Sequence, residues 1–124
     1  MPQLPHSIEL HDSKLAAIRH TPEGVTLELR PSYVHRDGKG WVQNADIHIV
    51  GASVRNTVTV PMRISDGVLK TPRGPYHNLL TLPLSEAGPV QMKLELESGE
   101  LIELHGSAVA VQMFGEPVFV EQFE

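Results

Sequence analysis

The sequence contains no cysteine in its 124 residues, which excludes both a disulfide framework and a zinc site built on thiolates. A chain without cysteine suits a reducing compartment. The opening residues 1–6 show neither the basic region nor the apolar region of a secretory signal. No apolar run approaches the roughly 18 residues that a membrane helix needs. We therefore expect a soluble, cytoplasmic protein.

Positive charge is scarce as well. Ten lysine and arginine residues stand against fifteen aspartate and glutamate residues, which gives a net charge of −5. The basic residues are scattered, whereas nucleic-acid binding needs clustered positive charge that displaces phosphate counterions. One tryptophan, two tyrosines and three phenylalanines also form no aromatic platform for a single strand. We expect neither a nucleic-acid partner nor a membrane partner.

Motifs of common enzyme classes are missing too. Neither a Gly-x-Gly-x-x-Gly nor a Walker pattern is present to cradle a phosphate. No Gly-x-Ser-x-Gly elbow presents a nucleophilic serine. The sequence predicts no cofactor and favours a non-enzymatic role.

Alternation of apolar and polar residues is what the sequence does contain. Residues 90–97 alternate strictly, residues 98–100 turn the chain, and residues 101–105 return, which is typical of a β-hairpin with one buried face. A second hairpin is predicted from residues 14–20 and 25–30 around a turn at residues 21–24. Pro31 should break or bulge its second strand, because proline cannot donate to the ladder.

Further strands and turns follow from the same pattern. We expect strands at residues 41–50, 58–64, 79–84, 108–114 and 118–123. Turn signals lie at residues 37–40, 65–67, 71–75, 85–89 and 115–117. Ten glycines and ten prolines leave little room for helix. Eight or nine short strands predict an all-β fold, an antiparallel β-sandwich or barrel, in a single domain of residues 1–124.

Seven histidines are the oddest feature of the composition. No two of them have the i, i+4 spacing of a helical metal site or the i, i+2 spacing of a strand-borne one. The simplest interpretation is therefore a set of surface histidines. The alternative is that His11, Asp12, His35 and Asp37 meet near one end of the sheet, where they could bind a metal or titrate near neutral pH.

Two further polar residues call for a structural explanation. Glu121 stands in an apolar final strand, so we expect it to be half-buried and paired with His11 or Arg19. We expect Asp12 to accept backbone N–H groups in a turn that leads into the first long strand. The acidic residues 95, 97, 100 and 103 should form a hydrated face. The candidate polar cluster is His11, Asp12, His35, Asp37 and Glu121.

Three segments together resemble a group of small bacterial proteins without an assigned activity. They are His11-Asp12-Ser13 before the first long strand, Ser65-Asp66-Gly67 with the later Leu82-Pro83-Leu84, and the Gly-x-x-x-Phe-Val-Glu-x-Phe ending at residues 115–123. Phe119 stands where the group usually has tyrosine. The resemblance implies an all-β bacterial protein and carries over no catalytic residue. Some small bacterial β-proteins with a similar His-Asp opening are associated with toxin immunity, which makes partner binding an expectation.

These observations favour a protein-binding or structural module. Residues 41–50 and 118–123 carry apolar side chains on both faces, so we expect strands that are covered on two sides or an edge that pairs with a second copy in a homodimer. The alternative is a small-ligand-binding or metal-binding β-barrel, with or without enzymatic activity, that uses His11, Asp12 and His35.

Overall fold

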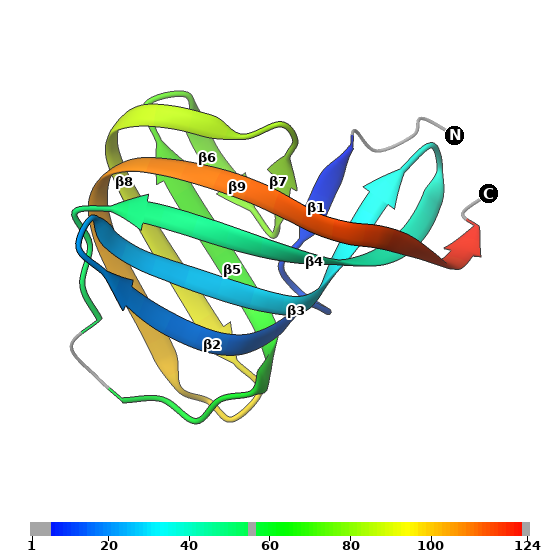
Figure 1. Cartoon of the computed structure of the whole chain (residues 1–124), viewed down its shortest axis with the longest axis horizontal. Helices are drawn as coiled ribbons and strands as arrows, with labels where there is room; N and C mark the ends of the chain where they lie inside the picture. The colour runs from blue at the N-terminus through cyan, green and yellow to red at the C-terminus, as the bar shows by residue number, and fades with distance from the viewer. Residues whose placement is uncertain (1–5, 55–56, 123–124) are drawn as a thin grey trace.

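The computed structural model describes residues 6–54 and 57–122, and within them the chain forms strands without a helix (Figure 1). The prediction of an all-β fold is confirmed. The strands are β1 (Ser7–Glu9), β2 (Lys14–Thr21), β3 (Gly24–Arg36), β4 (Lys39–Val50), β5 (Met62–Thr71), β6 (Gly74–His77), β7 (Leu79–Thr81), β8 (Ser85–Leu96) and β9 (Leu101–Gln122). No helix of this part of the chain is long and apolar enough to cross a membrane.

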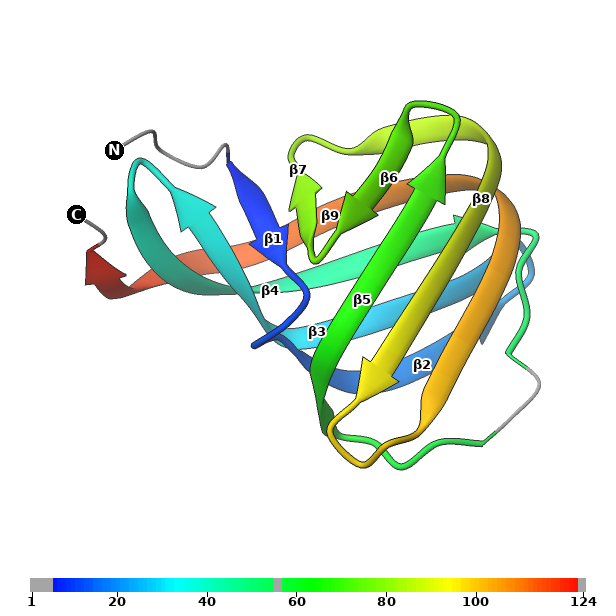
Figure 2. The ribbon, with the colours of Figure 1, turned by 180° about the vertical axis from the view of Figure 1, so that it is seen from behind.

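Six strands curl into a ring in the order β2-β5-β8-β9-β4-β3, and β3 pairs back onto β2 (Figures 1 and 2). All neighbouring strands of the ring are antiparallel. The seam between β2 and β5 is short, with only Lys14 opposite Arg63 and Leu15 opposite Met62. The fold is therefore barrel-like, one sheet closed on itself, rather than two separate sheets.

Apolar side chains from alternate positions of the strands fill the inside of the ring. Leu15, Leu27, Ile47, Met92 and Leu104 are all completely buried. An eight-stranded barrel has room inside for its own side chains or for one small ligand, whereas this ring has six strands and its interior is filled by these side chains. A ligand of this barrel would therefore bind on its outer surface.

Both predicted hairpins are present. Val90, Met92, Leu94 and Leu96 are buried while Lys93, Glu95 and Glu97 are exposed, and β8 pairs with β9 around the turn that follows. The β2–β3 hairpin closes at Thr21 opposite Gly24. At Pro31 the β3–β4 register shifts between Leu29 and Ser32, so β3 bulges there and continues to Arg36.

Three predicted turns are wrong, because the chain runs through them as strand. Residues 65–67 lie inside β5, residues 85–89 begin β8, and residues 115–117 lie inside β9. Each coincides with a register shift of the ladder, and a β-bulge accommodates glycine, proline and an extra residue without reversing the chain. At Gly67 a Cβ atom would lie 2.6 Å from Leu10 Cδ1, so close packing explains that glycine.

Two predicted strands have different limits. The strand expected at residues 58–64 begins only at Met62, because Pro61 has no N–H to pair and the N–H of Thr59 donates to the Glu100 carboxylate instead. The strand expected at residues 79–84 ends at Thr81, shortly before Pro83. Phe123, the last residue of the final predicted strand, lies outside the described residues.

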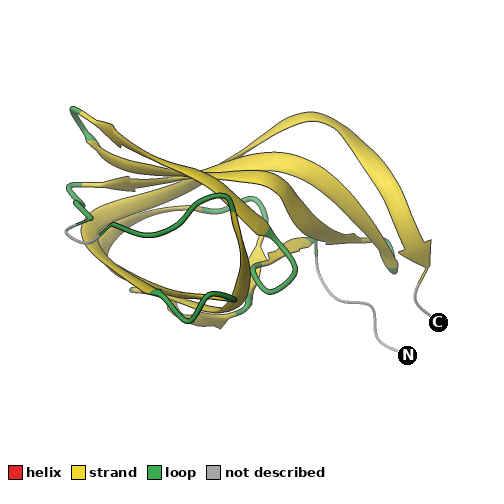
Figure 3. Cartoon of the chain, turned by 90° about the horizontal axis from the view of Figure 1, so that it is seen from below, coloured by secondary structure: helices red, strands yellow, loops and turns green. Residues whose placement is uncertain are grey.

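β3, β4 and β9 are longer than the wall of the ring and extend beyond it as an arm. We define the arm as residues 32–36 of β3, 39–44 of β4 and 112–122 of β9, with β1 paired alongside β3. Figure 3 shows these strands curving away from the ring. The arm carries the polar residues that the sequence singles out at this end of the sheet.

The alternation in β8 gives a direct test of the register. Leu94 is 1% exposed, so replacing it with alanine should lower the free energy of unfolding by about 2–5 kcal/mol. Glu95 is its exposed neighbour, and Glu95→Ala should change stability by less than about 0.5 kcal/mol. Urea denaturation of the two variants measures both values, and equal losses would show that the two faces of β8 are misassigned.

Candidate functional site

The outer face of the arm gathers polar side chains from three strands, β1, β3 and β9. Ser7 lies opposite His35, and His35 opposite Gly40, which in turn lies opposite Glu121. Residues in register on neighbouring strands point to the same face of a sheet. The polar side chains of β1, β3 and β9 are therefore brought together here, although they are far apart in the sequence.

Tyr33 ties three strands of the arm together. Its hydroxyl donates a hydrogen bond to Glu121 Oε1 at 2.5 Å. The Tyr33 side chain reaches from β3 to β9 by crossing over Gly40 of β4. A Cβ atom added to Gly40 would lie 2.1 Å from the Tyr33 hydroxyl oxygen. Glycine at this position is what lets the tyrosine span β4. The His35 ring packs edge-on against Tyr33, with 5.4 Å between ring centroids.

Glu9 links this tyrosine cluster to the turn after β1. Its Oε1 lies 3.6 Å from Nε2 of His35, whose side chain is only 9% exposed. Potential ligand atoms of Glu9, His11 and Asp12 all lie within 4.8 Å of one another. Glu9 therefore stands between a buried histidine on one side and an exposed histidine–aspartate pair on the other.

Ser13 fixes the turn that presents His11 and Asp12. It is completely buried, its N–H donates to Leu10 O at 3.0 Å, and its hydroxyl donates to Glu9 O at 2.6 Å. The hydroxyl also accepts the N–H of Tyr33 at 2.9 Å. Asp12 was expected to anchor this turn, but Ser13 makes these hydrogen bonds. The Asp12 carboxylate instead lies 3.5 Å from His11 Nδ1 and 3.8 Å from Arg63 Nη1.

The structure brings four of the five predicted residues to this end of the sheet, although not in the expected pairs. His11, Asp12 and His35 surround Glu9. Glu121 is exposed rather than half-buried, and it pairs with Tyr33 rather than with His11 or Arg19. β1, which leads into the His11 turn, pairs with β3 and β7 and not with β9. Asp37 lies apart at the tip of the β3–β4 turn, with its side chain 81% exposed and 3.6 Å from Arg36.

Arg19 belongs to a different ion-pair network on the outer wall of the ring. Its Nε lies 3.0 Å from Glu28 Oε2, and its Nη2 lies 3.6 Å from Asp46 Oδ2. Arg30 Nη2 lies 2.9 Å from the buried Asp46 Oδ1, and its Nη1 donates to the carbonyl oxygens of Leu29 and Ala45. Such mutual satisfaction of charge is typical of a structural network.

Sequence reasoning missed Glu9, Tyr33, Ser13 and Gly40. β1 has only three residues, too few to show an alternation that would assign Glu9 to a face. Tyr33 did carry a signal, since it stands two residues before His35 on a strand and therefore shares its face. The role of Gly40 depends on a tyrosine from the neighbouring strand, which no local pattern reveals.

Hydrogen bonds to carboxylates help to raise the pKa of both tyrosines. Burial raises the pKa of Tyr33, and its hydrogen bond to Glu121 raises the pKa further. The pKa of Tyr76 is raised mainly by its hydrogen bond to Glu86, 2.8 Å long. Burial alone would raise the pKa of Glu86, but hydrogen bonds from Thr71 and Tyr76 outweigh it and hold the pKa below its usual range.

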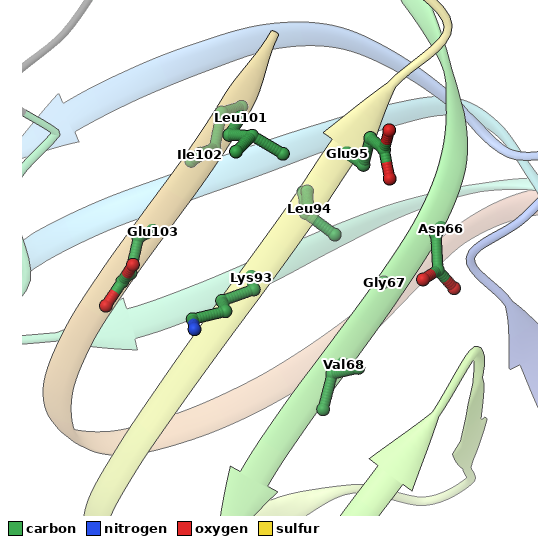
Figure 4. A pocket seen from close by; sticks show the side chains of 9 residues that line it. All are labelled: Asp66, Gly67, Val68, Lys93, Leu94, Glu95, Leu101, Ile102 and Glu103. Atoms are coloured by element: carbon green, nitrogen blue, oxygen red, sulfur yellow. The ribbon is translucent and has the colours of Figure 1, made fainter. Parts of the chain in front are cut away.

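A shallow hollow of about 250 Å³ lies on the outer wall of the ring, over β5, β8 and β9 (Figure 4). Lys93 and Glu103 are register neighbours on its surface, as are Asp66 and Glu95. All four side chains are exposed, so they are hydrated and do not converge on a buried point. Glu95 and Glu103, two of the four acidic residues expected to form a hydrated face, line this hollow, which lacks the apolar enclosure of a small-molecule site.

No protein-family model, curated protein or solved structure matches the chain. The resemblance to small bacterial proteins therefore stays a prediction.

The raised tyrosine pKa values predict an alkaline weakening of the fold. Unfolded tyrosine ionises near pH 10, so the stabilisation is fully present below about pH 10 and is lost as the pH rises through the folded values. Native protein just above pH 10 should show less phenolate absorbance than urea-unfolded protein. Tyr33→Phe should remove part of this difference and lower stability at neutral pH by about 1 kcal/mol. Tyr76→Phe is the matched variant, and a native phenolate titration identical to that of free tyrosine would contradict the prediction.

Proposed function

We propose that this chain is a non-enzymatic binding module that acts through the free edge of β9, and that its partner is a second copy of the chain. One observation carries the proposal. β9 pairs with β8 as far as Ala110, and Val111 N donates to Leu84 O at 3.0 Å. From Gln112 to Gln122 β9 pairs with β4 on one side, and within residues 6–54 and 57–122 no strand pairs with its other side.

Apolar side chains concentrate along this edge. Seven large hydrophobic side chains of the described residues are well exposed, and four of them lie between residues 114 and 120. They are Phe114, Val118, Phe119 and Val120. Natural edge strands are commonly protected from pairing by lysine, proline or bulges. This segment has no lysine or arginine, and its protective features are Glu116, Glu121 and Pro117 beside the bulge.

The segment is self-complementary in an antiparallel pair. A two-fold axis through Phe119 would place Val118 opposite Val120 of the second copy and the two Phe119 residues opposite each other. Glu116 would then face Gln122, so no two glutamates would be opposed. Cross-strand aromatic and β-branched pairs stabilise a sheet, whereas opposed like charges destabilise it.

Trp41 supports the same arrangement. Its ring packs edge-on against Phe119 with 5.5 Å between centroids. In a pair joined at Phe119, the two tryptophans and the two phenylalanines would form one aromatic row across the continuous sheet. Such a row adds aromatic contacts beyond simple area burial.

Dimer formation is the expected outcome for the purified protein. Sedimentation should show a concentration-dependent monomer–dimer equilibrium, and Val118→Lys should shift it towards monomer because the charge would enter the joined edge. Leu101→Lys is the matched control, since Leu101 is on the same strand and similarly exposed (65% against 60% for Val118) but lies at the far end of the ring. Each copy carries a net charge of −5, so added salt should strengthen the dimer by screening their repulsion.

A monomer at every concentration and salt level would overturn the second copy as partner. The same edge would then remain a site for an extended segment of another protein, added as a further strand. That outcome would fit the immunity-like partner that the resemblance implies.

A further inference from the structure

We propose that Glu9, His11 and Asp12 form a binding site for a divalent transition-metal ion, best matched by Zn²⁺, with His35 positioning the Glu9 carboxylate. The site lies in the turn after β1, on the outer face of the arm. The proposal does not depend on the free edge of β9.

The distances between the three side chains suit a single ion. Zinc bonds to nitrogen and oxygen are about 2.0–2.2 Å long, so two ligands of a tetrahedral site lie roughly 3.4 Å apart. His11 Nδ1 and Asp12 Oδ2 are already 3.5 Å apart. The Glu9 carboxylate lies within 4.8 Å of both, and His11 and Asp12 are exposed enough to rotate towards it.

The ligand types select the class of ion. One imidazole nitrogen with two carboxylates suits zinc and its transition-metal neighbours, while Ca²⁺ takes six to eight oxygen ligands. Three protein ligands leave further positions for water. Arg63 competes for Asp12, with 3.8 Å between its Nη1 and Asp12 Oδ1, but it also lies 3.7 Å from Glu97, which would keep it paired when a cation takes the Asp12 carboxylate.

The site is supported from behind by buried groups. His35 Nε2 lies 3.6 Å from Glu9 Oε1, and its ring is held against Tyr33. Ser13 bonds to both Glu9 and Tyr33 and so fixes the backbone on either side of the turn. Buried groups that contact a ligating carboxylate from behind restrict its orientation, as outer-shell residues of metal sites do.

Another histidine–carboxylate pair provides an internal comparison. His105 Nε2 lies 2.9 Å from Glu103 Oε1 on the outer wall of the ring, and both side chains are exposed. Among the described residues, the only group of three that could share an ion is Glu9, His11 and Asp12. The pair at His105 therefore has the same chemistry without a third ligand.

Calorimetric titration of the full chain with Zn²⁺ tests the proposal. We expect one equivalent to bind, and His11→Ala, Glu9→Gln and Asp12→Asn each to weaken the affinity by at least about tenfold, since even outer-shell partners are worth about 10–100-fold. His105→Ala should leave the affinity unchanged. His35→Gln should weaken binding while the stoichiometry stays at one. This variant removes the imidazole that contacts Glu9 but leaves all three metal ligands in place.

Three results would overturn the site. They are no binding, several weak equivalents that His11→Ala does not reduce, or displacement of Zn²⁺ by Ca²⁺ at equal concentration. Co²⁺ gives an independent readout, because its visible absorption reports a nitrogen- and oxygen-ligated centre that His11→Ala should abolish. Circular dichroism of each variant confirms folding, and repeating the titration in Val118→Lys separates ion binding from dimer formation.

Discussion

The long antiparallel ladder between β4 and β9 is the constraint on which the rest of the structure depends. It runs from Lys39 opposite Gln122 to Val50 opposite Ala108. β9 has 22 residues, and at about 3.3 Å per residue it is on the order of 70 Å long. β8 covers its second edge only as far as Ala110. The remaining half must leave the ring, and the arm, its polar face and its uncovered edge all follow from that excess length.

Apolar burial stabilises the arm near β1, whereas a side-chain hydrogen bond contributes at β9. On its inner face Ile8, Val34 and Trp41 are register neighbours in a row, and exposure rises from 0% at Ile8 to 52% at Phe119 beyond them. Apolar burial therefore fades towards β9. On the opposite face the Tyr33 hydroxyl reaches across Gly40 to Glu121, so a hydrogen bond to a charged group holds β9 where packing no longer does.

Alternation identified the all-β fold and both hairpins, since a two-residue period directly reports which face is buried. It failed where glycine and proline stand inside long strands. Gly88 and Gly115 have φ values of +115° and +72°, a conformation that turns and bulges share. Whether the chain reverses or continues at such a residue depends on whether a neighbouring strand pairs with the residues that follow it. That is a tertiary property, which a local signal cannot report.

The polar cluster shows the same division between local and tertiary information. Its residue types pointed to His11, Asp12 and His35, but their link, Glu9, lies on a three-residue strand whose position is set by pairing with β3 and β7. Contacts then continue from Glu9 through His35 and Tyr33 to Glu121 on the uncovered edge. An ion bound as proposed would act on this chain of contacts if it reorients Glu9. If it alters pairing at the edge, pairing must alter the affinity for the ion by the same factor, because coupling between two binding equilibria is reciprocal.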